Sequence, residues 1–418
     1  MKKHLLATAT LAALTLAGTA SATQARINSV GGGVKQYTFL DERNIFTLPA
    51  ELVKYGAWAD VEMGVGWTSF GFHYNFSPTV VLAIYGTSTG VQTLNFGDVS
   101  KGGTKVFADG NAISLGTGNG LAISQNTGVS NTGDGTTHKG TAILGVDLGS
   151  ARLGFLLAAW ADEARSFDDN EEITSNQGPL RLQLGIGAGF GTGMGDIDLA
   201  LHLGFALPTE EDSEGSAVDG KEIDIGFIFR GTFPFSGPHE LVPYVTLDVA
   251  FADSAATADG STAVSGLHFG AEVGMDIRLN LADGITVQPG IGFGGKITSK
   301  ESTPDGGDPT INRSHEFAFP FYSLAVDVKV FDWLDIRFGG RQRVYWVWTS
   351  GEDTNGDPIA STSEAKVDHV IATGVGINLP AGVSLDIEVS NDWWKRGPNA
   401  VTGDNGTFGL SAALSKDW

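Results

Sequence analysis

The segment GDIDLALHLGFAL, residues 195–207, alternates between apolar side chains and polar or small ones. Its apolar parity consists of Ile197, Leu199, Leu201, Leu203, Phe205 and Leu207. The other parity consists of Asp196, Asp198, Ala200, His202, Gly204 and Ala206. A period of two places successive side chains on opposite faces of a β-strand. The segment therefore predicts a strand with one apolar face and one face of charge and glycine.

The same pattern recurs in residues 222–233 and 266–281, where Glu, Asp, Arg, His and Gly oppose Ile, Phe, Leu and Val. A soluble sandwich seldom keeps charge and glycine on one face through so many strands. A strand that has lipid on one side and a water-filled lumen on the other needs this division. The pattern predicts an all-β fold, a transmembrane antiparallel β-barrel.

Short and long connections alternate from residue 140 onward. The short turns are expected at 149–150, 192–195, 235–239, 282–284, 331–332 and 380–382. The long connections, rich in Asp, Glu, Gly and Ser, are expected at 163–178, 209–220, 254–262, 300–315, 350–363 and 395–405. Outer-membrane barrels have short periplasmic turns and longer external loops. Sixteen strand segments can be counted; fourteen is the alternative, because 88–139 shows no clear pattern.

Tryptophans mark the ends of the predicted strands. Trp346 and Trp348 end one strand, Trp393 and Trp394 end another, and Trp333 and Trp418 lie at the opposite ends. Twelve steps from Leu334 to Trp346 rise about 30 Å at about 3.3 Å per residue and about 40° tilt. That distance crosses the hydrocarbon layer, so the tryptophans predict aromatic belts at both membrane interfaces.

The N-terminus predicts export. Lys2 and Lys3 precede an apolar run from Leu5 to Leu16 and a small-residue site at 20–22, which together indicate a signal peptide over 1–22. The chain has 48 acidic and 26 basic residues, a net charge of -22, which argues against nucleic-acid binding. It has no cysteine. We expect a bacterial outer-membrane location, with outer-membrane lipid, lipopolysaccharide and the periplasmic barrel-insertion machinery as partners, and no cofactor.

Residues 26–56 lack the alternation. Their basic residue, glycine pair, acidic residue, asparagine and Pro-Ala element occur in the order Arg26, Gly31, Gly32, Asp41, Asn44, Pro49 and Ala50. This segment resembles the N-terminal hatch of the outer-membrane long-chain fatty-acid transporter family, although Leu48 stands where that family has an asparagine. The resemblance implies a plug over 23–55 inside a monomeric barrel over 56–418, and passage of poorly soluble molecules.

The predicted lumen is mainly polar. Only TVVLAIYG, residues 79–86, is apolar on both parities, and we expect it to pack against Ile45, Phe46 and Leu48 of the plug. Arg337, Arg341, Arg343 and Lys329 form a basic group facing Asp386 and Glu388. These charges predict either a field that selects solutes or ion pairs that also hold Asp41, Glu42 or Glu51 of the plug.

Three further hypotheses concern the loops and histidines. Asp353, Asn355, Asp357 and Glu364 have calcium-loop spacing, but Pro358 stands at the position of the turn glycine. A solvated loop without metal is the favoured interpretation. His369 beside Asp368, His202 near Asp198, and His268 lack a nucleophile motif, so no enzyme activity is expected. The sequence predicts a passive channel or transporter for small solutes; a general porin with a charged eyelet or an adhesive barrel are the alternatives.

Overall fold

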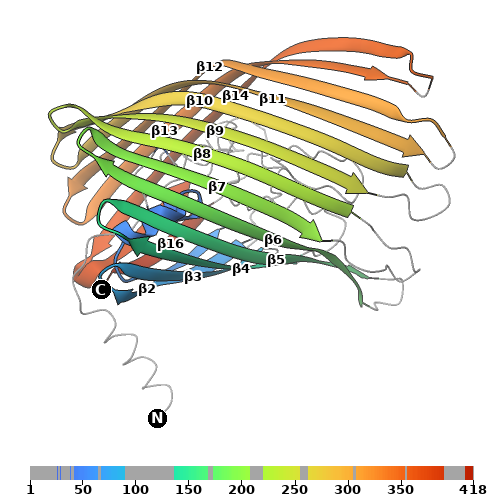
Figure 1. The fold of residues 1–418 in the computed structure, drawn as a ribbon. Helices are drawn as coiled ribbons and strands as arrows, with labels where there is room; N and C mark the ends of the chain where they lie inside the picture. Colours follow the sequence, from blue (N-terminus) through green and yellow to red (C-terminus); the bar gives the residue numbers. More distant parts are fainter. Residues whose placement is uncertain are drawn as a thin grey trace, which may run out of the picture.

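Sixteen antiparallel strands close into one barrel in the computed structural model (Figure 1). The structure describes Arg26, Ser29, Thr38 and residues 42–64, 67–89, 136–167, 173–207, 220–254, 262–304, 307–353, 355–389 and 410–417. Each strand pairs with its neighbours in the sequence, and the first pairs with the last. This confirms the higher of the two predicted strand numbers. No helix in these described ranges is long and apolar enough to cross a membrane.

The strands differ greatly in length. They are β1 Trp58–Gly64, β2 Trp67–Ser77, β3 Val80–Thr89, β4 Thr136–Asp147, β5 Ala151–Phe167, β6 Ile173–Thr192, β7 Gly195–Leu207, β8 Gly220–Ser236, β9 His239–Ser254, β10 Thr262–Ala282, β11 Ile285–Pro304, β12 Thr310–Phe331, β13 Leu334–Glu352, β14 Pro358–Leu379, β15 Val383–Val389 and β16 Leu410–Asp417. Three short 3-10 helices are also described, η2 Glu42–Phe46, η3 Pro49–Lys54 and η4 Pro380–Gly382.

The predicted alternation decides which side chains point inward. On β7, Asp198 and His202 are buried within the barrel, whereas Leu201 is exposed on its outside. Leu184 and Phe269 are likewise exposed on the outside. Soluble proteins rarely expose an apolar surface as large as this exterior of Leu, Ile and Phe. The exterior is a membrane-facing band and the interior is the polar face.

The turns lie where the sequence predicted them, but several strands run beyond the predicted limits. β12 begins at Thr310 and β14 at Pro358, within stretches expected to be loops. Polar residues occupy both faces there, so the alternation fades, while the backbone still pairs across strands. In the turn over η4, Ala381 has a φ of 68°, the left-handed conformation that is unusual without glycine.

Three of the tryptophans predicted at the membrane interfaces point outward. Trp333, Trp346 and Trp348 are exposed on the outside of β12–β14 and the turn between β12 and β13. Trp393, Trp394 and Trp418 lie outside the described residues. Trp58 instead points inward and is buried against His73, with ring centroids 4.7 Å apart. Tryptophan at the start of a strand is therefore not enough to predict an interface position.

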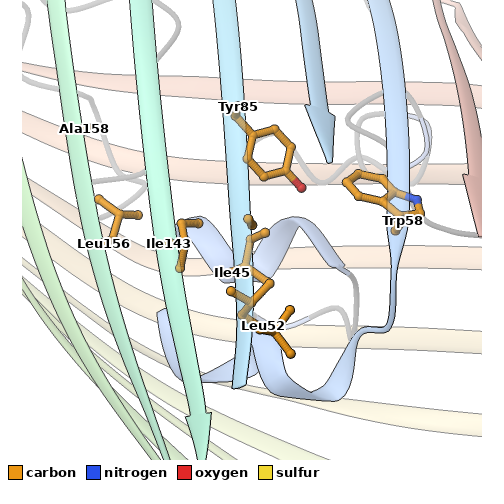
Figure 2. Close-up of a cluster of buried hydrophobic side chains, with 9 residues drawn as sticks. Ile45, Leu52, Trp58, Tyr85, Ile143, Leu156 and Ala158 are labelled. Atoms are coloured by element: carbon orange, nitrogen blue, oxygen red, sulfur yellow. The ribbon is translucent and has the colours of Figure 1, made fainter. Parts of the chain in front are cut away.

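Residues 42–55, here called the inner segment, lie against the inner wall (Figure 2). Ile45 and Leu52 pack with Val81, Tyr85 and Ile143, and Phe46 packs against the same cluster. The rings of Phe46 and Tyr85 meet edge to face at 4.7 Å. The apolar stretch over 79–86 therefore packs against Ile45 and Phe46, as expected from the sequence.

Leu48 departs from that expectation. It packs in a second cluster with Ala200, Ile228, Tyr244, Ala318 and Phe321. The chain bends between η2 and η3, where the backbone amide of Leu48 donates to the carbonyl of Asn44. This bend turns Leu48 away from β3, whose Val81 and Tyr85 pack against Ile45. The inner segment consequently contacts two different parts of the wall.

The lipid-facing assignment predicts a depth-dependent effect of charge. Leu201→Arg, about six residues above the turn before β7, should lower the free energy of unfolding by about 2–4 kcal/mol, because arginine is costly near the bilayer midplane. Leu281→Arg, beside the short turn after β10, should cost about 0–1 kcal/mol. Urea unfolding from lipid vesicles would measure both. Equal costs at the two positions would contradict the assigned depth.

Candidate functional site

A buried carboxylate joins the inner segment to the barrel wall. Glu51 lies on η3, and Arg230 lies on the inward face of β8; both side chains are 0% exposed. Arg230 Nη2 is 2.9 Å from Glu51 Oε2 and donates to Asp198 Oδ2 at 2.6 Å. One guanidinium therefore bridges a carboxylate of the inner segment and a carboxylate of β7.

Two further cations complete this group. Lys54 Nζ is 2.6 Å from Glu51 Oε1 and 3.1 Å from Asp196 Oδ2. Arg152 on β5 reaches Asp198 at 3.2 Å and Asp196 at 3.4 Å. We call these residues the anchor cluster, and its members are Glu51, Lys54, Arg152, Asp196, Asp198 and Arg230. Three cations and three anions balance, which a buried ionic group requires.

The charge state of Glu51 follows from these neighbours. Burial on its own raises the pKa of this carboxyl, but the charges of Arg230 and Lys54 and their hydrogen bonds outweigh burial and lower its pKa from 4.5 to about 2. Glu51 is therefore ionised at neutral pH despite its full burial. Glu51 therefore docks as a carboxylate against the guanidinium of Arg230.

Main-chain hydrogen bonds hold other points of the N-terminal region. His202 Nε2 donates to the carbonyl oxygen of Thr47 at 2.8 Å. Arg278 Nη2 and Gln288 Nε2 both donate to the carbonyl of Thr38, each at 3.1 Å. These wall side chains satisfy buried carbonyl groups that have no strand partner. They fix the path of the backbone, whereas the anchor cluster fixes a side chain.

Two glycines of the wall let the backbone of η3 approach closely. A Cβ at Gly154 would lie 2.1 Å from the carbonyl carbon of Pro49, and one at Gly187 would lie 2.9 Å from the amide nitrogen of Ala50. Only a residue without Cβ fits between strand and inner segment at such distances. These two inward glycines form the surface of the wall on which η3 rests.

The basic residues predicted to form one group in the lumen pair with different carboxylates. Arg337 on β13 pairs with Asp386 on β15 and lies 3.5 Å from Asp335. It crosses Gly376 of the intervening strand, where a Cβ would lie 2.4 Å from its Nη2. Asp327 is 3.6 Å from Arg337 and also receives a hydrogen bond from Arg26, at 3.3 Å. The Arg337–Asp386 contact follows the ion-pair hypothesis, with Arg26 as the residue of the N-terminal region involved.

The other predicted lumen residues lie elsewhere. Arg343 Nη2 is 3.4 Å from Glu272 Oε2 and stacks over Phe321 at 5.6 Å, while Tyr244 donates to Glu272 Oε1 at 3.0 Å. Lys329 pairs at 3.0 Å with Asp332 of the short turn, apart from the arginines. Arg341 and Glu388 are half-buried on β13 and β15.

The predicted plug residues are placed unevenly. Asn44, Pro49 and Ala50 are buried in the inner segment, and Arg26 contacts the wall. Gly31, Gly32 and Asp41, and the side chain of Glu42, lie outside what the structure describes. Arg230, Arg152 and Lys54 were not singled out from the sequence. For the two arginines the only signal was an inward charge on a strand that also carries inward glycines, and Lys54 lies on η3.

The structure does not bring the predicted loop residues together into one site, since Asp353 and Glu364 have separate partners. Asp353 Oδ1 accepts the backbone amides of Asn355 and Asp357, each at 2.9 Å, and these bonds lower its pKa. Glu364 pairs at 3.2 Å with Lys366. Within the described ranges, no three or more His, Asp or Glu side chains lie close enough together to hold a metal ion. His268 bonds Asp248 at 2.7 Å and Thr298 at 3.2 Å, and the side chains of Asp368 and His369 lie outside the description.

Comparisons with known proteins give distant likenesses only. No family model and no characterised relative matches the sequence. Among solved structures, the ferric-catecholate import receptor Fiu of E. coli K12 has a TM-score of 0.38 and 8% identity over 86% of this chain and 81% of that chain. The alcaligin receptor FauA of Bordetella pertussis has a TM-score of 0.36 and 7% identity over 87% and 75%. The ferric yersiniabactin receptor FyuA of Yersinia pestis has 0.35 and 9% over 87% and 80%.

This chain has the fold of an outer-membrane β-barrel. Its own closed sheet and apolar exterior show that architecture. Likenesses with so low a TM-score do not extend to ligand or mechanism. The resemblance of the N-terminal segment to the long-chain fatty-acid transporters finds no support in these comparisons.

Removing the central cation should be strongly destabilising. Arg230→Met leaves Glu51 and Asp198 buried with one fewer cation, and losing one partner of a buried ionic group costs about 3–5 kcal/mol. Arg313→Met is the matched control, because Arg313 forms an exposed pair with Glu352 at 2.8 Å. Such a pair contributes about 0–1 kcal/mol. Urea unfolding measures both, and equal losses would contradict the anchor cluster.

The docking of the inner segment should depend on pH in one direction. The ionised carboxylate of Glu51 stabilises docking at every pH above about 4.5, and this contribution is lost as the pH falls toward about 2. Hydrogen exchange of residues 42–56, corrected for the intrinsic rate at each pH, should show constant protection from pH 7 to about 4.5 and a decline below.

Glu51→Gln is the control for that experiment, since two other carboxylates, Asp196 and Asp198, face the same cations. The variant should be less protected at neutral pH and should lose less protection on acidification. Protection of the wild type that persists unchanged to pH 2, or disappears above pH 5, would count against Glu51 as the anchor.

Proposed function

We propose that the protein is a bacterial outer-membrane transporter that passes small polar solutes passively around its inner segment. The observation that carries the proposal is a barrel of sixteen strands with a charged interior and a short segment anchored inside it. Barrels of about 16 strands are too wide for wall side chains to fill. A segment anchored in such a lumen narrows the route that solutes take.

The lining favours polar over hydrophobic solutes. The two apolar clusters described in the lumen are covered by the inner segment through Ile45, Leu52 and Leu48. Those surfaces are therefore already used for packing. Arg337, Arg343 and Glu272 line the wall beyond them. A hydrophobic ligand needs a mostly apolar site, and the inner segment already occupies these two apolar surfaces.

The histidines are used for structure in this proposal. His202 holds the backbone of Thr47, and His268 is held between Asp248 and Thr298 on neighbouring strands. We assign no catalytic step to them. Lipid, lipopolysaccharide and the insertion machinery are the partners that a barrel of this kind requires to fold and reside in the outer membrane.

Single-channel conductance in a planar bilayer tests the proposal. The mature protein should show small conductance, and a variant lacking residues 26–55 should show a clearly larger one, because the lumen then loses its inner segment. Arg343→Gln should change the ion selectivity of the deletion variant. Arg313→Gln, on the exposed pair, serves as its control.

Two results would contradict the proposal. If both forms fold and neither conducts, the barrel is not a channel, and an adhesive role of the external loops becomes the better explanation. If the two forms conduct equally, the inner segment does not restrict the route, and the protein behaves as a general porin.

A further inference from the structure

Two aromatic side chains of the wall between β9 and β13 lie flat across glycines. The hydroxyl oxygen of Tyr244 would be 2.3 Å from a Cβ on Gly274, and the ring of Phe321 would be 2.3 Å from a Cβ on Gly292. These two glycines pair with each other across β10 and β11. Because neither glycine has a Cβ, Tyr244 and Phe321 cover this part of the wall from both sides.

The inner segment closes over these two rings. Leu48 packs in one cluster with Tyr244 and Phe321, and the three side chains are 0%, 0% and 1% exposed. Water therefore does not reach them, and we call these three residues the lumen floor. Farther along the same wall, toward the long connections, Asp248 on β9 and Lys296 on β11 are 27% and 22% exposed. The lumen on that side of the floor is accessible to water.

A pair of opposite charges lies on the lumen floor. Arg343 Nη2 is 3.4 Å from Glu272 Oε2, which is longer than the about 2.7–2.9 Å of a strong charge-assisted hydrogen bond. The guanidinium of Arg343 lies 5.6 Å from the centroid of the Phe321 ring, and Tyr244 donates to Glu272 Oε1 at 3.0 Å. Glu272 and Arg343 are 7% and 16% exposed. The pair therefore lies where the water-accessible part of the lumen ends.

The charges of β9–β13 from this pair toward the long connections balance one another. Among the described residues, the inward carboxylates and cations of this stretch are Asp248, Glu272 and Glu316, and Lys296, Lys300 and Arg343. Lys296 pairs with Glu316 at 2.9 Å, and His268 bonds Asp248 at 2.7 Å. A solute with a single charge is attracted by one half of these groups and repelled by the other half. The approach to the floor therefore favours neither anions nor cations.

We propose that the Glu272–Arg343 pair is the site at which the transporter binds a solute arriving from outside, and that this solute is a small zwitterion. The carboxylate of the solute pairs with Arg343 and its ammonium group pairs with Glu272, so both charges of the site gain a partner. A solute with one charge pairs with one of these residues and is repelled by the other. This inference rests on the proposed function and names its solute class.

Saturation-transfer difference NMR on the mature protein in detergent micelles tests the site. The probes are glycine, acetate, ethylammonium and acetamide, which have similar sizes and differ in charge. Glu272→Gln combined with Arg343→Gln removes both charges together, so neither is left without its partner. Arg313→Gln combined with Glu352→Gln is the matched control, because it removes an exposed pair of the same kind. Circular dichroism would establish that both double variants are folded.

The glycine signal of the wild type should saturate at a concentration several times lower than the signals of the other three probes. The double variant at Glu272 and Arg343 should raise that concentration several-fold, and the control variant should leave it unchanged. Three results would overturn the inference: no saturable glycine signal, equal or tighter binding of one of the other probes, or glycine binding that the double variant keeps.

The wild-type comparison of the four probes decides the solute class even if the double variant does not fold. Because binding is measured without transport, the two proposals fail separately. A barrel that conducts and does not bind glycine would overturn the site and leave the transporter. A barrel that binds glycine at this pair and does not conduct would keep the site and overturn the proposed passage.

Discussion

The bridge from Glu51 through Arg230 to Asp198 is the interaction on which the lumen depends. A buried carboxylate without a cation would be unionised or undocked, because the interior of a protein solvates charge poorly. Arg230 supplies that cation from β8, and Lys54 and Arg152 complete the charge balance. The segment that they hold brings Ile45, Leu48 and Leu52 against the wall and so covers the apolar part of the lumen.

Glycines of the wall leave the space that a charged side chain and the inner segment occupy. Arg337 crosses the wall at Gly376, Pro49 and Ala50 rest on Gly154 and Gly187, and Ser29 lies 2.3 Å from where a Cβ would stand on Gly374. A larger residue at any of these places would occupy the volume of the group above it. The same absence of Cβ that weakens a strand in water permits close contacts inside the barrel.

The barrel could be predicted from local pattern, because period-two alternation depends only on residues close in the sequence. Residues 195–207 give the inward and outward faces of β7 correctly. The anchor cluster could not be predicted this way. Glu51 and Arg230 are brought together by the closing of the sheet, and many inward arginines were equal candidates. The arginines of β13 show the same limit, since Arg337 and Arg343 reach different carboxylates.

Leu48 was correctly predicted to pack against the inner wall, but it meets other strands than the predicted residues 79–86. The sequence indicates that an apolar residue of the N-terminal segment must be buried, but the bend after Asn44 decides which wall it meets. Strand ends were misplaced for a related reason. Above the membrane both faces of β12 and β14 meet water. The sequence there no longer alternates between apolar and polar residues, although the backbone still pairs as a strand.

Disulfide trapping tests the central claim most directly, that η3 is docked on the inner wall. A Cβ at Gly145 would lie 3.2 Å from Leu52 Cβ, near the separation that a disulfide needs. The double variant Leu52→Cys with Gly145→Cys should oxidise to an intramolecular disulfide in the folded barrel, and each single variant should keep its thiol. Two free thiols in the folded, oxidised double variant would show that the inner segment does not occupy the place described.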